Sequence, residues 1–400
     1  MSAKRALTLL LGAAATGFLC YMLFSRFPDI RRNVAARDSL AYWSAGRLLI
    51  QGQNPYDHPQ VFRLEREHGY SDERPLVLRT PPWSLFMVVP LGPLSPFGAW
   101  LCWMAFSFGS LLAAMRICRT LYGQRTPRDL VSAVGYTFAP IPACLVSGQM
   151  GLVLLLGIVL FLWWERERPF WAGAILILPF AKPHLLSLFW LTLFLWVVAR
   201  KKRELALGFI CAFLSAIAIG LLFDVRVFQD YREMLRTASI AHEFIPALSG
   251  VLRLIFFHRL FWVQFVPIAG GLVWCAWFFW RNFANWNWTE HGPALLIVSV
   301  LTTPYSWLAD ESVLLPAILQ GAAFAYQARA QMKVRTKLAL VMFALLNMLL
   351  LLILRSKIPF ATGIYFWSSL VWFFWYFFAR GLHSRPVEEV RLSSGAKMVS

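Results

Sequence analysis

Repeated apolar stretches, several close to the length of a membrane-spanning helix, constrain this chain more than any other feature. A helix needs about 20 apolar residues to cross the hydrocarbon core of a bilayer. Prolines at 90, 93 and 96 interrupt the second stretch, so residues 83–93 are expected to form a half-helix before a crossing at about 96–116. The candidate stretches are 6–24, 83–116, 130–147, 150–164, 170–181, 183–199, 205–223, 261–280, 293–306, 311–328, 338–354 and 360–379. We therefore predict an all-α integral membrane protein, a polytopic bundle of about 10–12 transmembrane helices.

The composition excludes a water-soluble domain. Hydrophobic residues make up 59% of the chain and charged residues only 14%, whereas soluble domains are about 25% charged. The net charge of +18 would suggest nucleic acid in a soluble protein, but here the basic residues lie mostly in short segments between apolar runs. We therefore expect the lipid bilayer as a partner and no nucleic acid.

The basic segments favour one topology. With Lys4 and Arg5 in the cytoplasm and residues 83–116 counted as one crossing, the cluster from Arg200 to Arg203 falls inside, as the positive-inside rule requires. Residues 25–82 then form a long first extracytoplasmic loop. We expect one membrane-embedded domain over 1–380 and a short cytoplasmic tail over 381–400.

The first loop is predicted to contain interfacial helical structure. Residues 39–51 have a partly amphipathic pattern, and Gly52 is a plausible stop. Asp38, just before this helix, has two interpretations. It suits an N-cap, which favours aspartate, and also a general base held at the membrane surface beside a lipid-borne substrate, and the two roles need not exclude each other.

Three cationic or titratable side chains lie in segments predicted on the same extracytoplasmic side. Lys182 stands between two short apolar runs and either extends to the interface or contacts a phosphate, with His184 beside it. Arg253 follows a small-residue turn and is either an interfacial anchor or a bidentate phosphate ligand.

The remaining polar candidates are weaker alone. Asp310 and Glu311 open an apolar run, where the helix dipole favours carboxylates, but they also suit an acceptor hydroxyl. Gln149 forms a polar turn with Gly148. No ATP-binding, hydrolase or cysteine-histidine metal motif occurs, so neither a metal nor a cofactor is expected. A DxD pair is absent too, so any sugar donor is not expected to be a cytoplasmic nucleotide sugar.

Several motifs, in order from about 37 to 320, resemble glycosyltransferase family 87. They are Arg37-Asp38-Ser39-Leu40-Ala41-Tyr42-Trp43, Gly52-Gln53-Asn54-Pro55-Tyr56-Asp57, Thr80-Pro81-Pro82-Trp83, Gly148-Gln149, Lys182-Pro183-His184 and Thr303-Pro304-Tyr305-Ser306-Trp307. Some relatives carry histidine just after the Ser-x-Trp of the last motif, whereas this chain has Leu308-Ala309-Asp310. The resemblance implies a GT-C fold with its site on the extracytoplasmic face.

The resemblance also implies the chemistry and the site. A hexose or pentose, with mannose favoured, would pass from a polyprenyl-phosphate donor to an envelope glycolipid or glycan, with inversion, in the bacterial inner membrane facing the periplasm. Asp38 would be the base, and the donor phosphate would meet Lys182, Arg253 and His184. Substrate contacts are expected from Arg37, Tyr42, Gln149, Trp307 and Asp310.

A polytopic lipid or solute transporter, such as a flippase, is the competing interpretation. Transporters tend to show inverted repeats and charges at the membrane midplane. In this chain the unusual polar residues gather towards one predicted face, and no internal repeat is evident, which favours the enzyme.

Overall fold

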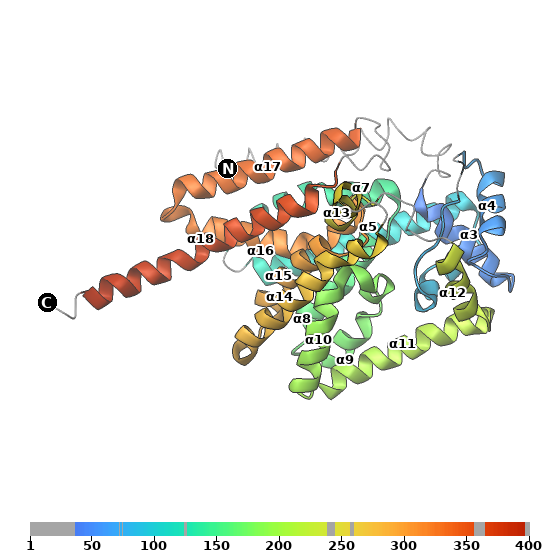
Figure 1. Cartoon of the computed structure of the whole chain (residues 1–400), viewed down its shortest axis with the longest axis horizontal. Coiled ribbons are helices and arrows are strands. Elements are labelled where there is room, and N and C mark those ends of the chain that lie inside the picture. Colours follow the sequence, from blue (N-terminus) through green and yellow to red (C-terminus); the bar gives the residue numbers. More distant parts are fainter. Residues whose placement is uncertain are drawn as a thin grey trace. The chain divides into compact units, whose positions relative to one another are not determined.

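Helices are the only regular secondary structure in the part of the chain that the computed structural model describes (Figure 1). The described residues are 37–71, 73, 75–123, 126–237, 245–256, 260–355 and 365–396. No strand occurs among them, which confirms the all-α class. The predicted first span at 6–24 and its basic start lie outside these residues.

The described helices group into two compact units. The first comprises 1–109, 145–149 and 213–239, and the second comprises 110–144, 150–212 and 240–400. Unit 1 contains α3 (Asp38–Ile50), α4 (His58–Glu67), the 3-10 helices η2 (Pro82–Met87) and η3 (Val89–Leu91), the first part of α5 (Pro96–Tyr122), the end of α11 (Arg203–Phe223) and α12 (Val227–Thr237).

The predicted helix in the first loop is confirmed as α3, but it is not amphipathic. It starts at Asp38, and Gly52 follows its end with a φ of +66°, a conformation that glycine adopts without strain. The side chains of Leu40, Tyr42 and Trp43 are all buried. The polar residues Ser39 and Ser44 are buried as well. The helix therefore does not divide into a buried apolar face and an exposed polar face.

Two glycines allow α3 to pack backbone to backbone against η3. A Cβ on Gly46 would lie 2.2 Å from the carbonyl oxygen of Val88, and one on Gly92 would lie 2.4 Å from the carbonyl oxygen of Gly46. Neither position has space for a side chain. The indole N–H of Trp43 adds a hydrogen bond of 2.9 Å to the carbonyl of Leu94, so α3 is fixed along its length.

Unit 2 holds the remaining helices. They are α6 (Arg128–Thr137), α7 (Pro140–Ser147, whose end belongs to unit 1), α8 (Gly151–Trp164), α9 (Pro169–Ile175), η4 (Pro179–Ala181), η5 (Pro183–Leu186), α10 (Ser187–Ala199), α13 (Leu248–Phe256), η7 (Phe261–Phe265), α14 (Val266–Asn282), η8 (Phe283–Asn285), α15 (Trp288–Thr302), η9 (Leu308–Leu314), α16 (Leu315–Gln327), η10 (Ala328–Ala330), α17 (Lys333–Arg355) and α18 (Ser368–Ala396).

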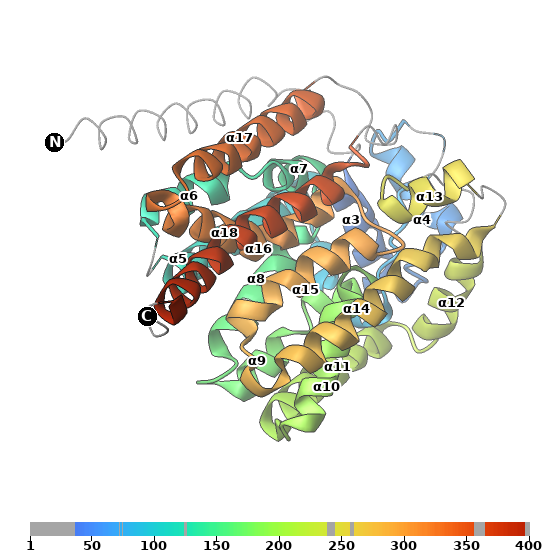
Figure 2. The same cartoon turned by 60° about the vertical axis from the view of Figure 1, so that its left-hand side comes forward.

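The core of unit 2 is built from helices that are buried on nearly all sides. The span formed by η9, α16 and η10 is 94% buried over its most apolar window, against 22% for α17. Figure 2 shows α15 between α14 and α18, and both neighbours contact it. Helices that are hydrophobic all round belong either in a protein core or against lipid, and here the two kinds are clearly separated.

Five helices are long and apolar enough to cross a membrane, or up to seven if each bent pair counts as one span, within the described residues. About 10–12 were expected from runs of about 20 apolar residues. Much of the difference has a local cause. The runs 170–181 and 183–199 form one pair bent by 115°, and α8 is too short for the test.

The bend in this pair occurs at Lys182. The residue before a proline is disfavoured in the helical region, and Lys182, followed by Pro183, has φ −128° and ψ 69°. The backbone therefore leaves the helix at this residue, and the lysine side chain is carried at a break in an apolar segment.

Candidate active site

Asp38 is the first residue of α3, and its carboxylate is engaged by a side chain rather than by the helix end. The N-cap is Arg37, with no side-chain capping bond, so Asp38 is not the predicted N-cap. Its Oδ2 accepts a hydrogen bond from the side-chain amide of Gln149. Two predicted site residues, 111 positions apart in the sequence, are thus in direct contact.

Two hydrogen bonds hold the segment 145–149 beside Gln149, and a ring contact between α3 and α5 supports one of their donors. The guanidinium of Arg37 donates to the carbonyl of Val146. The indole N–H of Trp103 donates to the carbonyl of Gly148 at 2.8 Å. The ring of Tyr42 packs edge-on against Trp103, with 4.9 Å between centroids. Arg37 and Tyr42, both predicted to contact substrate, therefore also support the Asp38–Gln149 pair.

Gly148 is required in the turn that presents Gln149. Its φ is +71°, and a Cβ there would lie 3.1 Å from the hydroxyl of Ser39. Both the backbone conformation and the space exclude a larger residue without displacement of α3 or of the turn.

A second carboxyl group, which the sequence did not single out, lies near Asp38. Glu65 of α4 is fully buried, and its Oε2 accepts from the backbone N–H of Leu76 at 3.0 Å. Burial raises the pKa of Glu65 to about 8, and the charge of Asp38 adds to the rise. Glu65 is therefore mainly protonated at neutral pH and adds little negative charge beside Asp38. Glu65 stands in a polar stretch of the sequence, so its burial beside Asp38 could not be predicted from the sequence.

In unit 2, Lys182 forms a buried ion pair with Asp310. The Nζ of Lys182 lies 2.6 Å from Oδ1 of Asp310, and the two residues are 7% and 0% exposed. The other oxygen, Oδ2, accepts from the backbone N–H of Trp307 at 3.0 Å. The neighbouring Glu311 serves a different contact, since its Oε1 accepts from the hydroxyl of Ser368 at 2.5 Å.

His184 and Arg253 both connect to the segment 303–307. The carbonyl of His184 accepts from the hydroxyl of Thr303 at 3.0 Å, and its ring packs edge-on against Tyr305. Arg253 donates to the amide oxygen of Gln264 at 2.8 Å, and Gln264 in turn donates to the carbonyl of Pro304.

The segment 303–307 thus links His184, Arg253 and the Lys182–Asp310 pair within unit 2. The hydroxyl of Ser249 on α13 adds a further hydrogen bond of 2.8 Å to the carbonyl of Thr303. Sequence reasoning missed Gln264 and Ser249, which are isolated polar residues in apolar surroundings. The predicted residues therefore form two clusters, one in each unit: Arg37, Asp38, Tyr42 and Gln149 in unit 1, and Lys182, His184, Arg253, Trp307 and Asp310 in unit 2.

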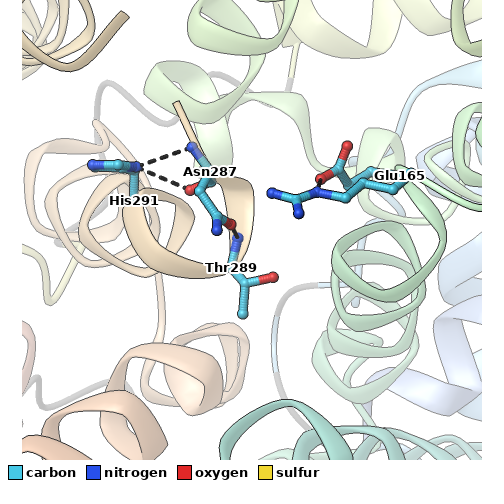
Figure 3. A network of polar contacts seen from close by, with 5 residues as sticks. Glu165, Asn287, Thr289 and His291 are labelled. Atoms are coloured by element: carbon cyan, nitrogen blue, oxygen red, sulfur yellow. Dashed lines mark hydrogen bonds and ion pairs between the residues drawn. The ribbon is translucent and has the colours of Figure 1, made fainter. Parts of the chain in front are cut away.

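Another polar network in unit 2 involves none of the predicted site residues (Figure 3). Glu165 pairs with Arg166 at 3.0 Å, and the side chain of Asn287 caps α15 by accepting from the N–H of Thr289. The ring of His291 contacts the backbone of Asn287. The contacts of Asn287 satisfy backbone groups at the start of α15. No group of three metal-ligating side chains gathers anywhere in the described ranges.

Comparison with known proteins identifies the family. The model of glycosyltransferase family 87 matches residues 80–304, which include Gln149, Lys182, His184 and Arg253. Arg37, Asp38, Tyr42, Trp307 and Asp310 lie outside the matched region. No curated protein and no solved structure is significantly similar to the chain. Because the family match covers more than half of the chain, the protein belongs to glycosyltransferase family 87 and is a membrane glycosyltransferase.

Proposed function

We propose that this glycosyltransferase transfers a sugar, with mannose favoured, from a polyprenyl-phosphate donor to an envelope glycolipid or glycan. The reaction would take place on the periplasmic side of a bacterial inner membrane. The observation that carries the proposal is the Asp38–Gln149 contact. The carboxylate of Asp38 is held by a side-chain amide at the start of a rigid, buried helix, as a positioned general base must be.

Asp38 would take the proton of the acceptor hydroxyl. The hydroxyl oxygen then forms a bond to the anomeric carbon from the face opposite the phosphate. The bond between that carbon and the phosphate oxygen breaks, and its electron pair leaves with the polyprenyl phosphate. One such displacement inverts the anomeric configuration. The side-chain amide of Gln149 donates to Asp38 and so keeps the carboxylate of Asp38 oriented before the substrate arrives.

The leaving phosphate needs compensating positive charge. The Lys182–Asp310 pair is neutral as a whole, so Lys182 would serve the phosphate only by being shared between Asp310 and the donor. Arg253 would supply the additional charge, and its guanidinium is oriented by a hydrogen bond to the amide oxygen of Gln264. Preorganised cations in a low-dielectric site stabilise developing negative charge strongly. His184 would add a hydrogen bond from its ring.

The test is sugar transfer by the purified full-length protein in nanodiscs. Radiolabelled polyprenyl-phosphate mannose, glucose and arabinofuranose are each offered with total bacterial lipid, and the product's anomeric configuration is determined by NMR. We expect one donor to give a labelled lipid or glycan of inverted configuration. A product of retained configuration would overturn the single displacement, and turnover with a nucleotide sugar alone would overturn the donor class.

A further inference from the structure

A cavity of unit 2 lies among residues that the proposed reaction does not use. Its volume is about 430 Å³, within the range of small-molecule sites. The wall from α14 includes Trp274, Trp277, Phe278 and Arg281, and the wall from α18 includes Arg380 and Gly381. On α14 these residues follow the spacing i, i+3, i+4 and i+7, so they occupy one face of the helix.

The cavity combines two guanidinium groups with aromatic surfaces. Arg281 lies over the ring of Trp277 at 5.5 Å, and Arg380 lies over the ring of Phe278 at 5.8 Å. The rings of Trp274 and Phe278 are stacked, 4.8 Å apart. Among the residues that the structure describes, neither arginine has a carboxylate within 4 Å, so their combined charge is not neutralised by an ion pair there.

The position of the cavity along α14 points to the membrane interface. It lies near the end of the candidate span Phe261–Asn285. On the same helix, Val273 is 74% exposed and Trp280 is 85% exposed. In a membrane protein such exposed apolar side chains face acyl chains, and tryptophan beside arginine is typical of the head-group level.

We propose that this cavity binds an anionic phospholipid. The head-group phosphate lies between Arg281 and Arg380, and the acyl chains run along the exposed face of α14. A phosphate suits the two guanidiniums, and the apolar surface next to them suits a lipid tail better than a soluble anion. The site shares no residue with the proposed sugar-transfer machinery, so the two proposals stand or fall separately.

Gly381 provides a direct way to close the cavity. A Cβ at this position would meet no atom within 4 Å, and leucine is a better helix former than glycine. The Gly381→Leu variant should therefore fold, while its side chain occupies the cavity. Gly109 of α5 also has open space around its Cβ position, so Gly109→Leu is the matched control.

The experiment measures binding of single lipids to the detergent-solubilised protein by native mass spectrometry. Phosphatidylglycerol is compared with phosphatidylcholine of the same acyl chains. A basic residue near an anionic lipid contributes about fivefold in affinity, so Arg281→Gln with Arg380→Gln should weaken phosphatidylglycerol binding by about 25-fold. Gly381→Leu should weaken it at least as much. The control pair Arg66→Gln with Arg329→Gln removes two other arginines that lie over aromatic rings and should leave binding within about twofold.

Three results would overturn the proposal. Equal binding of phosphatidylglycerol and phosphatidylcholine would show that no anion is recognised. Unchanged binding in both cavity variants would place the lipid elsewhere. Full competition by glycerol phosphate at the lipid's own concentration would identify a site for a soluble phosphate instead.

Discussion

The ammonium group of Lys182 lies 2.6 Å from Oδ1 of Asp310, 128 residues further along the chain, and both residues are buried. Breaking a buried ion pair by removal of one partner costs about 3–5 kcal/mol, because the other charge is left uncompensated. Replacement of both partners by apolar residues is often neutral. A comparison of single and double substitutions at Lys182 and Asp310 can therefore separate a structural role of the pair from a catalytic one.

We predict that Lys182→Met and Asp310→Asn each lower the thermal stability in nanodiscs, and that the double variant Lys182→Met/Asp310→Leu recovers most of it. Stability is followed by tryptophan fluorescence. Sugar transfer should stay abolished in the double variant, because the cation for the donor phosphate is missing. Recovery of transfer together with stability would show that the pair is only structural.

The turn at Gly148 is expected to matter for the rate. Gly148→Ala forces a non-glycine residue to a positive φ, at a cost of about 1 kcal/mol, and also presses its Cβ against Ser39. Gly69→Ala is the control, since Gly69 has a φ of +91° but open space around it. Gly148→Ala should lose at least as much stability as Gly69→Ala, and only Gly148→Ala should lose transfer activity by more than about tenfold while it is still folded. Equal rates in the two variants would contradict the role of this turn.

Glu65 predicts a pH dependence of stability. Its pKa rises from 4.5 to about 8 on folding because of burial, so the folded state binds more protons than the unfolded state between these values. The free energy of unfolding therefore falls as pH rises from about 4.5 to about 8, by up to about 1.4 kcal/mol per pH unit. Glu65→Gln should remove this part of the slope. Melting temperatures across the window, compared between wild type and variant, measure it, and identical slopes would refute the assignment.

Arg253 is expected to act on donor binding. Arg253→Gln removes the charge but keeps hydrogen-bonding capacity towards Gln264, so we predict a KM for the polyprenyl-phosphate donor raised by about tenfold or more. The KM for the acceptor should change little. Arg329→Gln, which removes an exposed arginine that lies over Tyr326, serves as the control. A rise in both KM values to the same extent would point to a general structural defect.

Much of the helical architecture could be predicted from the sequence, because spans such as 205–223 and 338–354 are recognised by length and apolarity alone. The stop of α3 at Gly52 follows from local chemistry as well. The buried environment of α3 could not be predicted, since small residues such as Ala41 and Gly46 leave its faces without a clear pattern. The Lys182-Pro183 step is visible in the sequence, but the bend of 115° between the runs on either side of it was not predicted.

Most residues of the candidate site could be predicted from the sequence, but the contacts between them could not. Lys182 and Asp310 were singled out by their charge beside apolar runs, Asp38 by its place at the start of a predicted helix, and Gln149 by its polar turn. Their pairing joins positions more than 100 residues apart, which spacing within a helix or turn cannot reveal. Glu65 was missed because its burial depends entirely on tertiary packing.

The central claim is that Asp38 is the general base, and one comparison tests it most directly. Asp38→Asn and Asp57→Asn make the same chemical change in one loop. Asp57 caps α4 by accepting from the N–H of Gln60, a role that asparagine fills equally well, and its other oxygen accepts from the side-chain amide of the same Gln60. Sugar transfer from the accepted polyprenyl-phosphate donor is measured for both variants in nanodiscs, with melting temperatures as a check on folding. We predict wild-type stability for both variants, a loss of about 10²–10⁴ in rate for Asp38→Asn and near wild-type transfer for Asp57→Asn. A folded Asp38→Asn variant that transfers sugar as fast as wild type would contradict the claim.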